Sequence, residues 1–332
     1  MDIKKSNEVS VIIPVFNAQD TLSYCLDSIL DQTFQDFEII IINDGSTDNS
    51  QKIIDNYKKK HPDKFKIYEQ KNSGVAITRN RGIEYAQGDY LFFIDNDDYI
   101  ENDYLETLLT EIKSSEKDMI IAGYKRINRL NGKEILNKRP SDKEYSKYMF
   151  LAPWAKIFRR ESIRSKDIKF LNSPLGEDVY FSVIASLKLS YEITKYIGYN
   201  WVYNRNSVSN TKQKTLNSLH NVVPLFEEIE KQIKNIKLSK DERILLEYFY
   251  IKTAIYYILL SVRKSESNEV CKKSEEIFGW IESKYPKYQK NKYIGFFKPR
   301  GEVFSTRFIV TFFIFLQKIK MERTFLKIYS KI

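Results

Sequence analysis

The first third of the chain alternates short apolar runs with segments whose apolar positions recur at helical spacing. The apolar runs, typical of buried parallel strands, cover residues 9–16, 38–42, 65–69, 90–94 and 119–124. The segments with helical spacing lie between them, at residues 22–30, 48–59 and 74–88. Strands that alternate with helices predict βαβ units with right-handed crossovers. The predicted fold class is therefore α/β, with a parallel sheet.

The pattern changes in the second half of the chain. After the polar stretch 128–147, residues 151–164 and 177–189 predict helices, and the aromatic, β-branched run 191–203 predicts one or two strands. From about Lys212 onward the pattern is almost wholly helical. We therefore expect a change of domain at 205–215.

Composition excludes several classes of protein, and the distribution of charge is more informative than its sum. With 332 residues, 42% of them apolar and 30% charged, the chain is globular, not disordered or fibrous. The net charge of +10 is uneven: residues 1–110 carry 11 Lys and Arg against 20 Asp and Glu, whereas residues 284–332, the basic tail, carry 12 against 2. Because the first third is acidic, the chain is not expected to be a uniformly basic nucleic-acid-binding protein.

Cysteine usage and the apolar runs favour a cytosolic protein. Cys25 and Cys271 are far apart and in no metal-ligand spacing, so a disulfide framework and a structural zinc site are not expected. The N-terminus is polar, and the longest apolar run, 308–316, is well short of the roughly 20 residues of a spanning helix. We expect a cytoplasmic location at the inner face of the cell membrane.

Polar clusters follow the predicted strands, at 16–17, 43–44, 70–72 and 95–98. In open α/β sheets ligands bind beyond the carboxyl ends of the strands. Asp95, Asp97 and Asp98 would repel one another without a cation among them, and Mg²⁺ or Mn²⁺ typically bridges one or two carboxylates to phosphates. A solvated loop between a strand and a helix is the alternative interpretation of this cluster.

Four of these segments together resemble the family 2 glycosyltransferases. They are residues 9–17, 42–48, 72–82 and 88–98, and their order and spacing match the family across about residues 8–125. The resemblance implies the GT-A fold, a Rossmann-like nucleotide-binding domain with a mixed, mostly parallel sheet. It also implies inverting transfer of a hexosyl or N-acetylhexosaminyl group from a nucleotide-diphosphate sugar, most simply a UDP-sugar, with Mn²⁺ or Mg²⁺, in bacterial surface-polysaccharide or capsule synthesis.

The same resemblance assigns a catalytic domain to residues 1–210. Its donor- and metal-binding half would be 1–125 and its acceptor-side half 126–210, and a C-terminal mainly helical region would follow at 211–332. The acceptor would be a glycan or a lipid-linked glycan.

Donor-binding roles carry over to the residues that match the family motifs. These are Pro14, Val15, Phe16, Asn17, Asp44, Ser46, Asn72, Gly74, Arg79, Asp95 and Asn96. Asp44 would accept a hydrogen bond from the nucleotide base, although an Asx turn that caps the next helix would also suit it. Arg79 would face the donor, unless it is an ordinary surface arginine.

By the same resemblance, Asp97 would be the principal metal ligand, with Asp95 sharing the ion or contacting the ribose, and Asp98 would be structural. Asp178 would be the general base for the acceptor hydroxyl, and Glu177 would orient it. The alternative is that these two acids only favour a helix N-terminus. Arg205 matches the family loosely as a phosphate contact.

The resemblance also gives acceptor-side roles to Trp154 and Lys156. Trp154 would stack on a sugar face or, equally well, be a core residue, and Lys156 would support the acceptor or the phosphates.

The basic tail combines apolar residues at helical spacing with lysines, which is what a helix at an anionic membrane surface requires. The alternative is a helix packed on its own domain or on a partner in a homo-oligomer.

Two other functions stay open at this stage. The first is a non-catalytic protein of the same fold that binds a nucleotide sugar or glycan. The second, binding of nucleic acid through the tail, predicts a strongly salt-dependent affinity, and we do not expect it. A dehydrogenase is excluded, because residues 14–17 replace the glycine-rich turn after the first strand.

Overall fold

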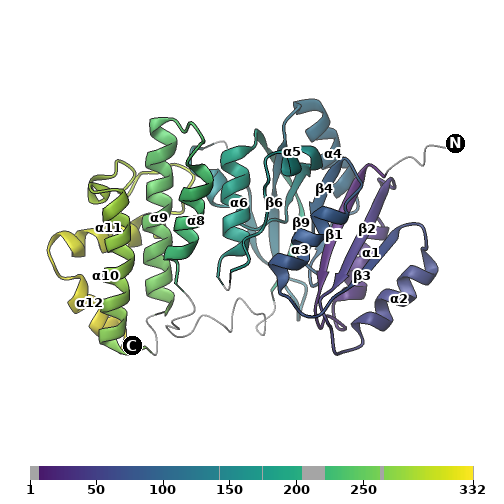
Figure 1. Ribbon diagram of the computed structural model, residues 1–332, viewed down its shortest axis with the longest axis horizontal. Coiled ribbons are helices and arrows are strands. Elements are labelled where there is room, and N and C mark those ends of the chain that lie inside the picture. Colours follow the sequence, from purple (N-terminus) through teal and green to yellow (C-terminus); the bar gives the residue numbers. More distant parts are fainter. Residues whose placement is uncertain (1–6, 142, 174, 204–220, 262–264, 332) are drawn as a thin grey trace. The chain divides into compact units, whose positions relative to one another are not determined.

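The computed structural model describes residues 7–141, 143–173, 175–203, 221–261 and 265–331 (Figure 1). The chain forms two compact units. The sheet unit comprises described residues 7–141, 150–173 and 177–203, and the helical unit comprises 143–149, 175–176 and 221–331 without 262–264. The domain change expected at 205–215, the start of the helical pattern at Lys212, and Arg205 lie outside the described residues.

A nine-stranded mixed sheet forms the centre of the sheet unit. Its strands are β1 (Val9–Val15), β2 (Phe37–Asn43), β3 (Phe65–Glu69), β4 (Tyr90–Phe93), β5 (Tyr99–Ile100), β6 (Met119–Asn128), β7 (Glu134–Lys138), β8 (Lys156–Arg159) and β9 (Tyr191–Tyr203). They follow the order β3-β2-β1-β4-β8-β6-β9-β5, and β7 pairs with β6. The pairs among β1 to β4 are parallel, as predicted, whereas β8 is antiparallel to both of its neighbours.

Six helices complete this unit. They are α1 (Leu22–Leu30), α2 (Ser50–Lys60), α3 (Val75–Tyr85), α4 (Tyr104–Ser115), α5 (Arg160–Ser165) and α6 (Glu177–Lys188). The helical spacing at 22–30 is confirmed by α1, which buries Leu22, Cys25, Leu26 and Ile29. The α/β class and the run of elements from β1 to β4 are therefore as the sequence predicted.

The helix expected at 151–164 is wrong for most of its length. Residues 156–159 form β8, which lies between β4 and β6, and only 160–165 are helical. Pro153 and the positive φ of Ala155 (55°) interrupt a helix before β8 begins. Pairing on both sides then decides the conformation, and a local pattern does not contain that information.

Strands β5 and β7 were not predicted, and α4 was expected only as a helix without bounds after the acidic cluster. Helix α4 has a clear helical pattern, because Leu105, Leu108, Leu109 and Ile112 are all buried on one side. In contrast, β5 has two residues, and β7 exposes four of its five residues, so neither has an apolar pattern to find.

A close approach between Gly88 and β1 explains the glycine at the start of the motif segment 88–98. The Gly88 N–H donates to Ser10 Oγ (2.8 Å), and Ser10 Oγ donates to the buried Glu38 carboxylate (2.5 Å). A Cβ atom on Gly88 would lie 2.6 Å from Ser10 N and 2.7 Å from Val9 C, which are main-chain atoms that cannot move aside.

We predict that Gly88→Ala lowers the free energy of unfolding by about 1–3 kcal/mol, because an added methyl group here overpacks the sheet. Denaturant unfolding followed by circular dichroism measures this. The exposed neighbour provides the control, Asp89→Ala, which should change the stability little. Equal stabilities for Gly88→Ala and the wild type would contradict the close approach.

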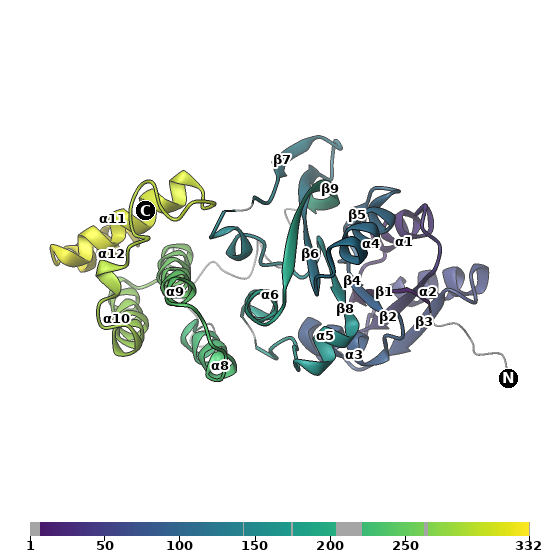
Figure 2. The ribbon, with the colours of Figure 1, turned by 90° about the horizontal axis from the view of Figure 1, so that it is seen from above.

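The helical unit contains α8 (Val223–Ile233), α9 (Lys240–Ser261), α10 (Ser267–Lys284), α11 (Phe304–Lys318) and α12 (Glu322–Tyr329), with short 3₁₀ turns at Ser146–Tyr148 and Tyr288–Lys290. Figure 2 looks along α8, α9 and α10, which lie side by side. Length and composition alone would let α9 cross a membrane, and it is the one helix of the described chain of which this is true. However, 61% of its apolar stretch is buried in protein, as expected of a core helix.

Candidate active site

The candidate site lies where β1 and β4 end. β1 has β2 on one side and β4 on the other, so the strand order reverses here. In open α/β sheets ligands bind at such a point, beyond the carboxyl ends of the strands. The loop after β4 reaches the end of β1, because Asn96 Nδ2 donates to Pro14 O (2.8 Å). The structure thus brings the predicted donor-binding residues 14–17 next to the acidic cluster 95–98.

The loops after β1 and β2 are joined side by side. Asn17 adopts a positive φ of 48°, and its N–H donates to Ser46 Oγ (3.0 Å) while its Oδ1 accepts from Thr47 N (2.8 Å). The Asp44 N–H donates to Val15 O (2.8 Å). Residues 14–17, Asp44 and Ser46 therefore form one continuous polar edge, with the Phe16 side chain exposed on it.

Asp44 holds the segment 70–74 against this edge. Its Oδ1 accepts from Gln70 Nε2 (2.6 Å) and Ser73 N (2.8 Å), and its Oδ2 accepts from Gly74 N (2.9 Å). Gly74 has a φ of 88°, which a residue with a side chain rarely adopts. The helix-capping alternative is not what Asp44 does here, because the N–H of Ser50 at the start of α2 donates to Asp48.

Asn72 is exposed beside Asp44 and Gly74, at the turn that Asp44 holds. Gly45 allows this turn to approach, since a Cβ there would lie 2.9 Å from Asn72 N.

Arg79 on α3 connects the acidic cluster to the proposed base. Its Nη2 donates to Asp95 Oδ1 (2.7 Å) and its Nη1 donates to Asp178 Oδ1 (2.5 Å). The guanidinium is buried, with 3% of the residue exposed, and lies 5.3 Å from the centroid of the Phe170 ring. Burial opposes its charge, but Asp178 and then Asp95 outweigh that effect and raise the pKa of Arg79. Arg79 is therefore not a surface arginine.

Asp178 and Glu177 occupy the first turn of α6, as predicted. Burial is the largest cause that raises the pKa of Asp178, to about 7; Glu177 and Asp95 raise it further, and Arg79 opposes them. A carboxyl group whose pKa lies near neutrality is suited to accept and release a proton. Since Arg79 binds Oδ1, the second oxygen, Oδ2, is the one that can meet a substrate.

Asp98 fixes the acidic loop to β9. Its Oδ2 accepts from Tyr199 Oη (2.6 Å) and its Oδ1 accepts from Val202 N (2.8 Å). Burial raises the pKa of this carboxyl. Because both oxygens bind the protein, Asp98 positions the loop that carries Asp95 and Asp97.

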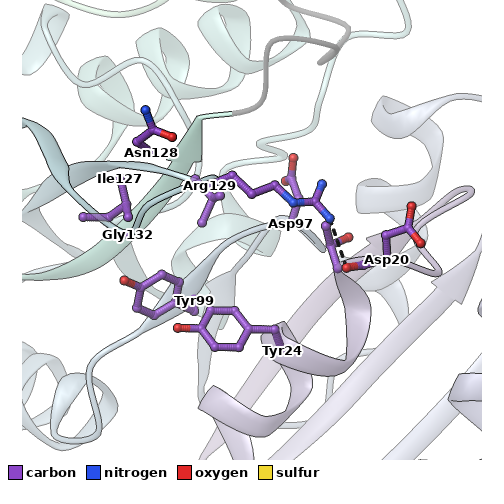
Figure 3. A pocket seen from close by; sticks show the side chains of 10 residues that line it. Asp20, Tyr24, Asp97, Tyr99, Ile127, Asn128, Arg129 and Gly132 are labelled. Carbon is purple, nitrogen blue, oxygen red and sulfur yellow. Dashed lines mark hydrogen bonds between the residues drawn. The ribbon is translucent and has the colours of Figure 1, made fainter.

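Asp97 lies in the wall of a cavity of about 230 Å³ (Figure 3). Arg129, from the turn after β6, extends toward Asp97 and donates through Nη2 to Asp20 O (3.1 Å). The opposite wall contains Tyr24 and Tyr99, whose rings meet edge to face at 4.8 Å. Burial, followed by the charge of Asp95, raises the pKa of Asp97 to about 6.

The carboxylates of Asp95 and Asp97 suit a divalent ion that completes its coordination with phosphate and water. Among the described residues, no group of three or more His, Cys, Asp and Glu side chains is arranged around a single ion. Mg²⁺ and Mn²⁺ do not need such a group when phosphate and water complete their coordination. Asp97, together with the oxygen of Asp95 that Arg79 does not bind, supplies the hard oxygen donors that these ions prefer.

Trp154 and Lys156 lie in the core of the sheet unit. The indole of Trp154 stacks on Tyr199 (4.6 Å, 7°), and 9% of the residue is exposed. Lys156 is 1% exposed, and its Nζ donates to the main-chain carbonyls of Phe150 (2.7 Å) and Ala152. For Trp154 this is the core position that the sequence left open. For Lys156 it corrects the expected contact with acceptor or phosphate, because the ammonium is used to hold residues 150–152.

Two residues of this network received no role from the sequence. Gln70 donates to Asp44 and accepts from Arg81 Nη1 (2.5 Å), and Tyr199 joins Asp98 to the aromatic core. Gln70 follows β3 at the same edge as the other polar clusters, so its position in the sequence could have indicated a role at the site. No sequence feature could have indicated Tyr199, because its contact with Asp98 depends on strand pairing over about a hundred residues.

Comparisons with known proteins agree with this geometry. The profile of the family described as "Glycosyl transferase family 2" matches residues 10–211. The uncharacterized glycosyltransferase YibD of Escherichia coli is 31% identical over 255 residues, which are 70% of this chain and 73% of that protein. The poly(ribitol-phosphate) beta-glucosyltransferase of Bacillus spizizenii is 33% identical over 203 residues, 59% of this chain and 32% of that protein.

The first 349 residues of S. aureus TarS, solved in complex with UDP-GlcNAc, share the fold. The TM-score is 0.74 at 19% sequence identity, and the match covers 98% of this chain and 91% of that one. Against curated relatives the chain spans 27% to 73% of their length.

Proposed function

Because the chain belongs to glycosyltransferase family 2, we propose that it transfers a sugar, with inversion, from a nucleotide-diphosphate sugar to a hydroxyl group of a glycan or lipid-linked glycan. One observation carries this proposal. Arg79 binds Asp95 of the acidic loop and Asp178 of α6 at the same time, so that a carboxylate proposed to hold the metal ion and a candidate base share one site.

The donor would lie along the edge formed by residues 14–17, Asp44 and 72–74. Asn17 joins the loop after β1 to the loop after β2, and Asp44 holds residues 73 and 74 beside them. This edge ends at the acidic cluster 95–98. A uridine nucleotide is our choice, since TarS was solved with UDP-GlcNAc. A hexosyl or N-acetylhexosaminyl group and a cell-surface polysaccharide as product are consistent with the relatives' names.

Mn²⁺ or Mg²⁺ would be held by Asp97 and Asp95. The ion would supply charge neutralisation for the diphosphate as it leaves. The chain's own residues do the rest: Asp98 and Tyr199 fix the loop that carries these ligands, and Arg79 holds Asp95 in place.

The proton of the acceptor hydroxyl would pass to Asp178. As the acceptor oxygen forms its bond to the anomeric carbon, the bond from that carbon to the diphosphate oxygen breaks, and the nucleoside diphosphate leaves with the electron pair. The Asp178 carboxylate takes the hydroxyl proton, and Arg79 fixes its orientation through Oδ1.

A cavity next to Asp97 offers a place for the acceptor sugar. Arg129, Tyr24 and Tyr99 surround the cavity next to Asp97, and aromatic faces beside polar groups suit a sugar ring. We propose this cavity as part of the acceptor side, in place of Lys156.

We expect transfer to take place in the cytoplasm. Cys25 and Cys271 are both buried free thiols, and unpaired cysteines are typical of proteins in a reducing compartment.

A set of nucleotide sugars, tested for thermal stabilisation with and without Mn²⁺, examines the donor proposal. We expect a UDP-sugar to raise the melting temperature in the presence of Mn²⁺, because a ligand that binds only the native state stabilises it. Stabilisation that is equal for all nucleotides and independent of the metal would contradict the proposed site.

A non-catalytic protein that binds a nucleotide sugar is the second candidate function. Such a protein would bind the nucleotide sugar along the same polar edge. It would not require a proton acceptor such as Asp178, whose pKa is raised to about 7. Donor turnover separates the two candidates.

A further inference from the structure

Helix α11 of the helical unit exposes a stripe of apolar side chains. Its members all have between 40% and 58% of their surface exposed, and they are Phe304, Phe308, Phe312, Phe315 and Ile319. With about 100° between successive residues, these five positions fall within an arc of about 80°. They therefore form one continuous strip along the helix, named here the phenylalanine stripe.

The stripe is not the packed face of this helix. The residues that α11 buries are Val310, Phe313, Ile314 and Leu316, on the other side, and α11 packs on α9 and α12. A helix at the surface of a soluble protein normally presents polar residues on the face opposite its buried one. Here that face is aromatic, which marks an interaction surface.

The preceding loop enlarges the apolar surface. The Phe296 ring lies 6.0 Å from that of Phe308, and Phe297 is 84% exposed. Phe308 and Phe312 lie in register, with their ring centroids 6.2 Å apart. Phe296, Phe308 and Phe312 thus form a row of neighbouring rings within the exposed apolar surface.

The basic tail, which contains the stripe, is almost entirely positive in charge. The basic tail has 12 basic residues and two acidic ones, Glu302 and Glu322. Glu302 is buried against Lys252 (3.2 Å), and Glu322 accepts a hydrogen bond from Ser274. In contrast, Lys298, Lys318, Lys320 and Lys327 are exposed.

We propose that the phenylalanine stripe binds the surface of a bilayer rich in anionic phospholipid. The rings would enter the boundary between headgroups and acyl chains, and the lysines beside them would contact lipid phosphates. A second copy of this chain fits less well, because it would bring two cationic surfaces together. This proposal does not rest on the transfer reaction.

Flotation with lipid vesicles tests it on the full-length chain. We expect binding to vesicles of phosphatidylcholine with 30% phosphatidylglycerol, weakening as salt rises, and little binding to phosphatidylcholine alone. Phe304→Ser with Phe315→Ser should lower the partition coefficient about tenfold or more, because two exposed rings lose their contact with the lipid. Lys318→Glu with Lys320→Glu should lower it similarly on anionic vesicles only.

A matched double variant, Ile135→Ser with Leu136→Ser, removes two exposed apolar residues of the sheet unit and should bind as the wild type does. Circular dichroism confirms that each variant is folded. The proposal is overturned if the wild type does not float, or if the phenylalanine variants float unchanged. It is also overturned if the stripe instead produces a dimer in sedimentation that the same variants abolish.

Discussion

Asp178→Asn is expected to bind the donor normally and to lose transfer by about 10²–10⁴-fold, the usual contribution of a general base. The amide has the shape of the carboxylate but cannot take the acceptor proton. Donor binding should persist, because the polar edge at 14–17, Asp44 and 72–74 does not involve this side chain. Initial rates and donor affinity, measured on the same preparation, check both parts.

The control for this variant is Asp167→Asn, an exposed aspartate of the same unit that pairs only with Lys169 among the described residues. It should transfer at the wild-type rate. Wild-type activity in Asp178→Asn as well would assign the base to another residue.

The pH dependence of kcat/KM gives a second readout of the same residue. The pKa of Asp178 is raised to about 7, and the base acts in its deprotonated form, so the rate should rise with pH below 7 and level off above it. In Asp178→Asn the residual rate should lose this rise. A profile flat from pH 5 to 8 in the wild type would contradict the role.

Asp97→Ala is expected to remove the metal-dependent part of donor binding. Mutation of a residue that only supports a metal ligand typically lowers metal affinity 10- to 100-fold. Removal of the ligand Asp97 itself should therefore lower it about 100-fold or more. Titration calorimetry of the donor with Mn²⁺ and with EDTA measures this. In EDTA, the variant and the wild type should bind the nucleotide alike.

Asp20→Ala is the matched control, because Asp20 lines the same cavity as Asp97 and is not a proposed ligand. It should retain the metal dependence. If Mn²⁺ strengthens donor binding equally in Asp97→Ala and the wild type, the ion lies elsewhere.

The sequence predicts the polar edge of the sheet well, for a physical reason. Residues at the carboxyl ends of parallel strands meet wherever the strands are adjacent, so Asn17, Asp44 and Asn96 could be grouped before any coordinates were known. Asp178 was placed correctly at the start of a helix by local pattern alone.

Partners across the fold could not be predicted. That Arg79 binds both Asp95 and Asp178 depends on contacts 16 and 99 residues away along the chain, which no local spacing encodes. Lys156 shows the same limit. The short motif around it predicted a position on the acceptor or phosphate side. However, Lys156 begins β8, which is central in the sheet, so its side chain lies in the core.

The tail shows what structure adds to a pattern. The spacing of Phe304, Phe308 and Phe312 already indicated an amphipathic helix, but not which face would be covered. The structure buries Phe313 and Ile314 and leaves the phenylalanine stripe exposed, so what it adds to the positions already read from the spacing is the face that stays uncovered.

Release of nucleoside diphosphate from a UDP-sugar is the measurement that tests the proposed transferase most directly. With Mn²⁺, the wild type should release UDP slowly in the absence of an acceptor, and Asp97→Ala should not. Folded wild-type protein that binds a nucleotide sugar but releases no nucleotide, with or without candidate acceptors, would contradict catalysis and leave a binding protein.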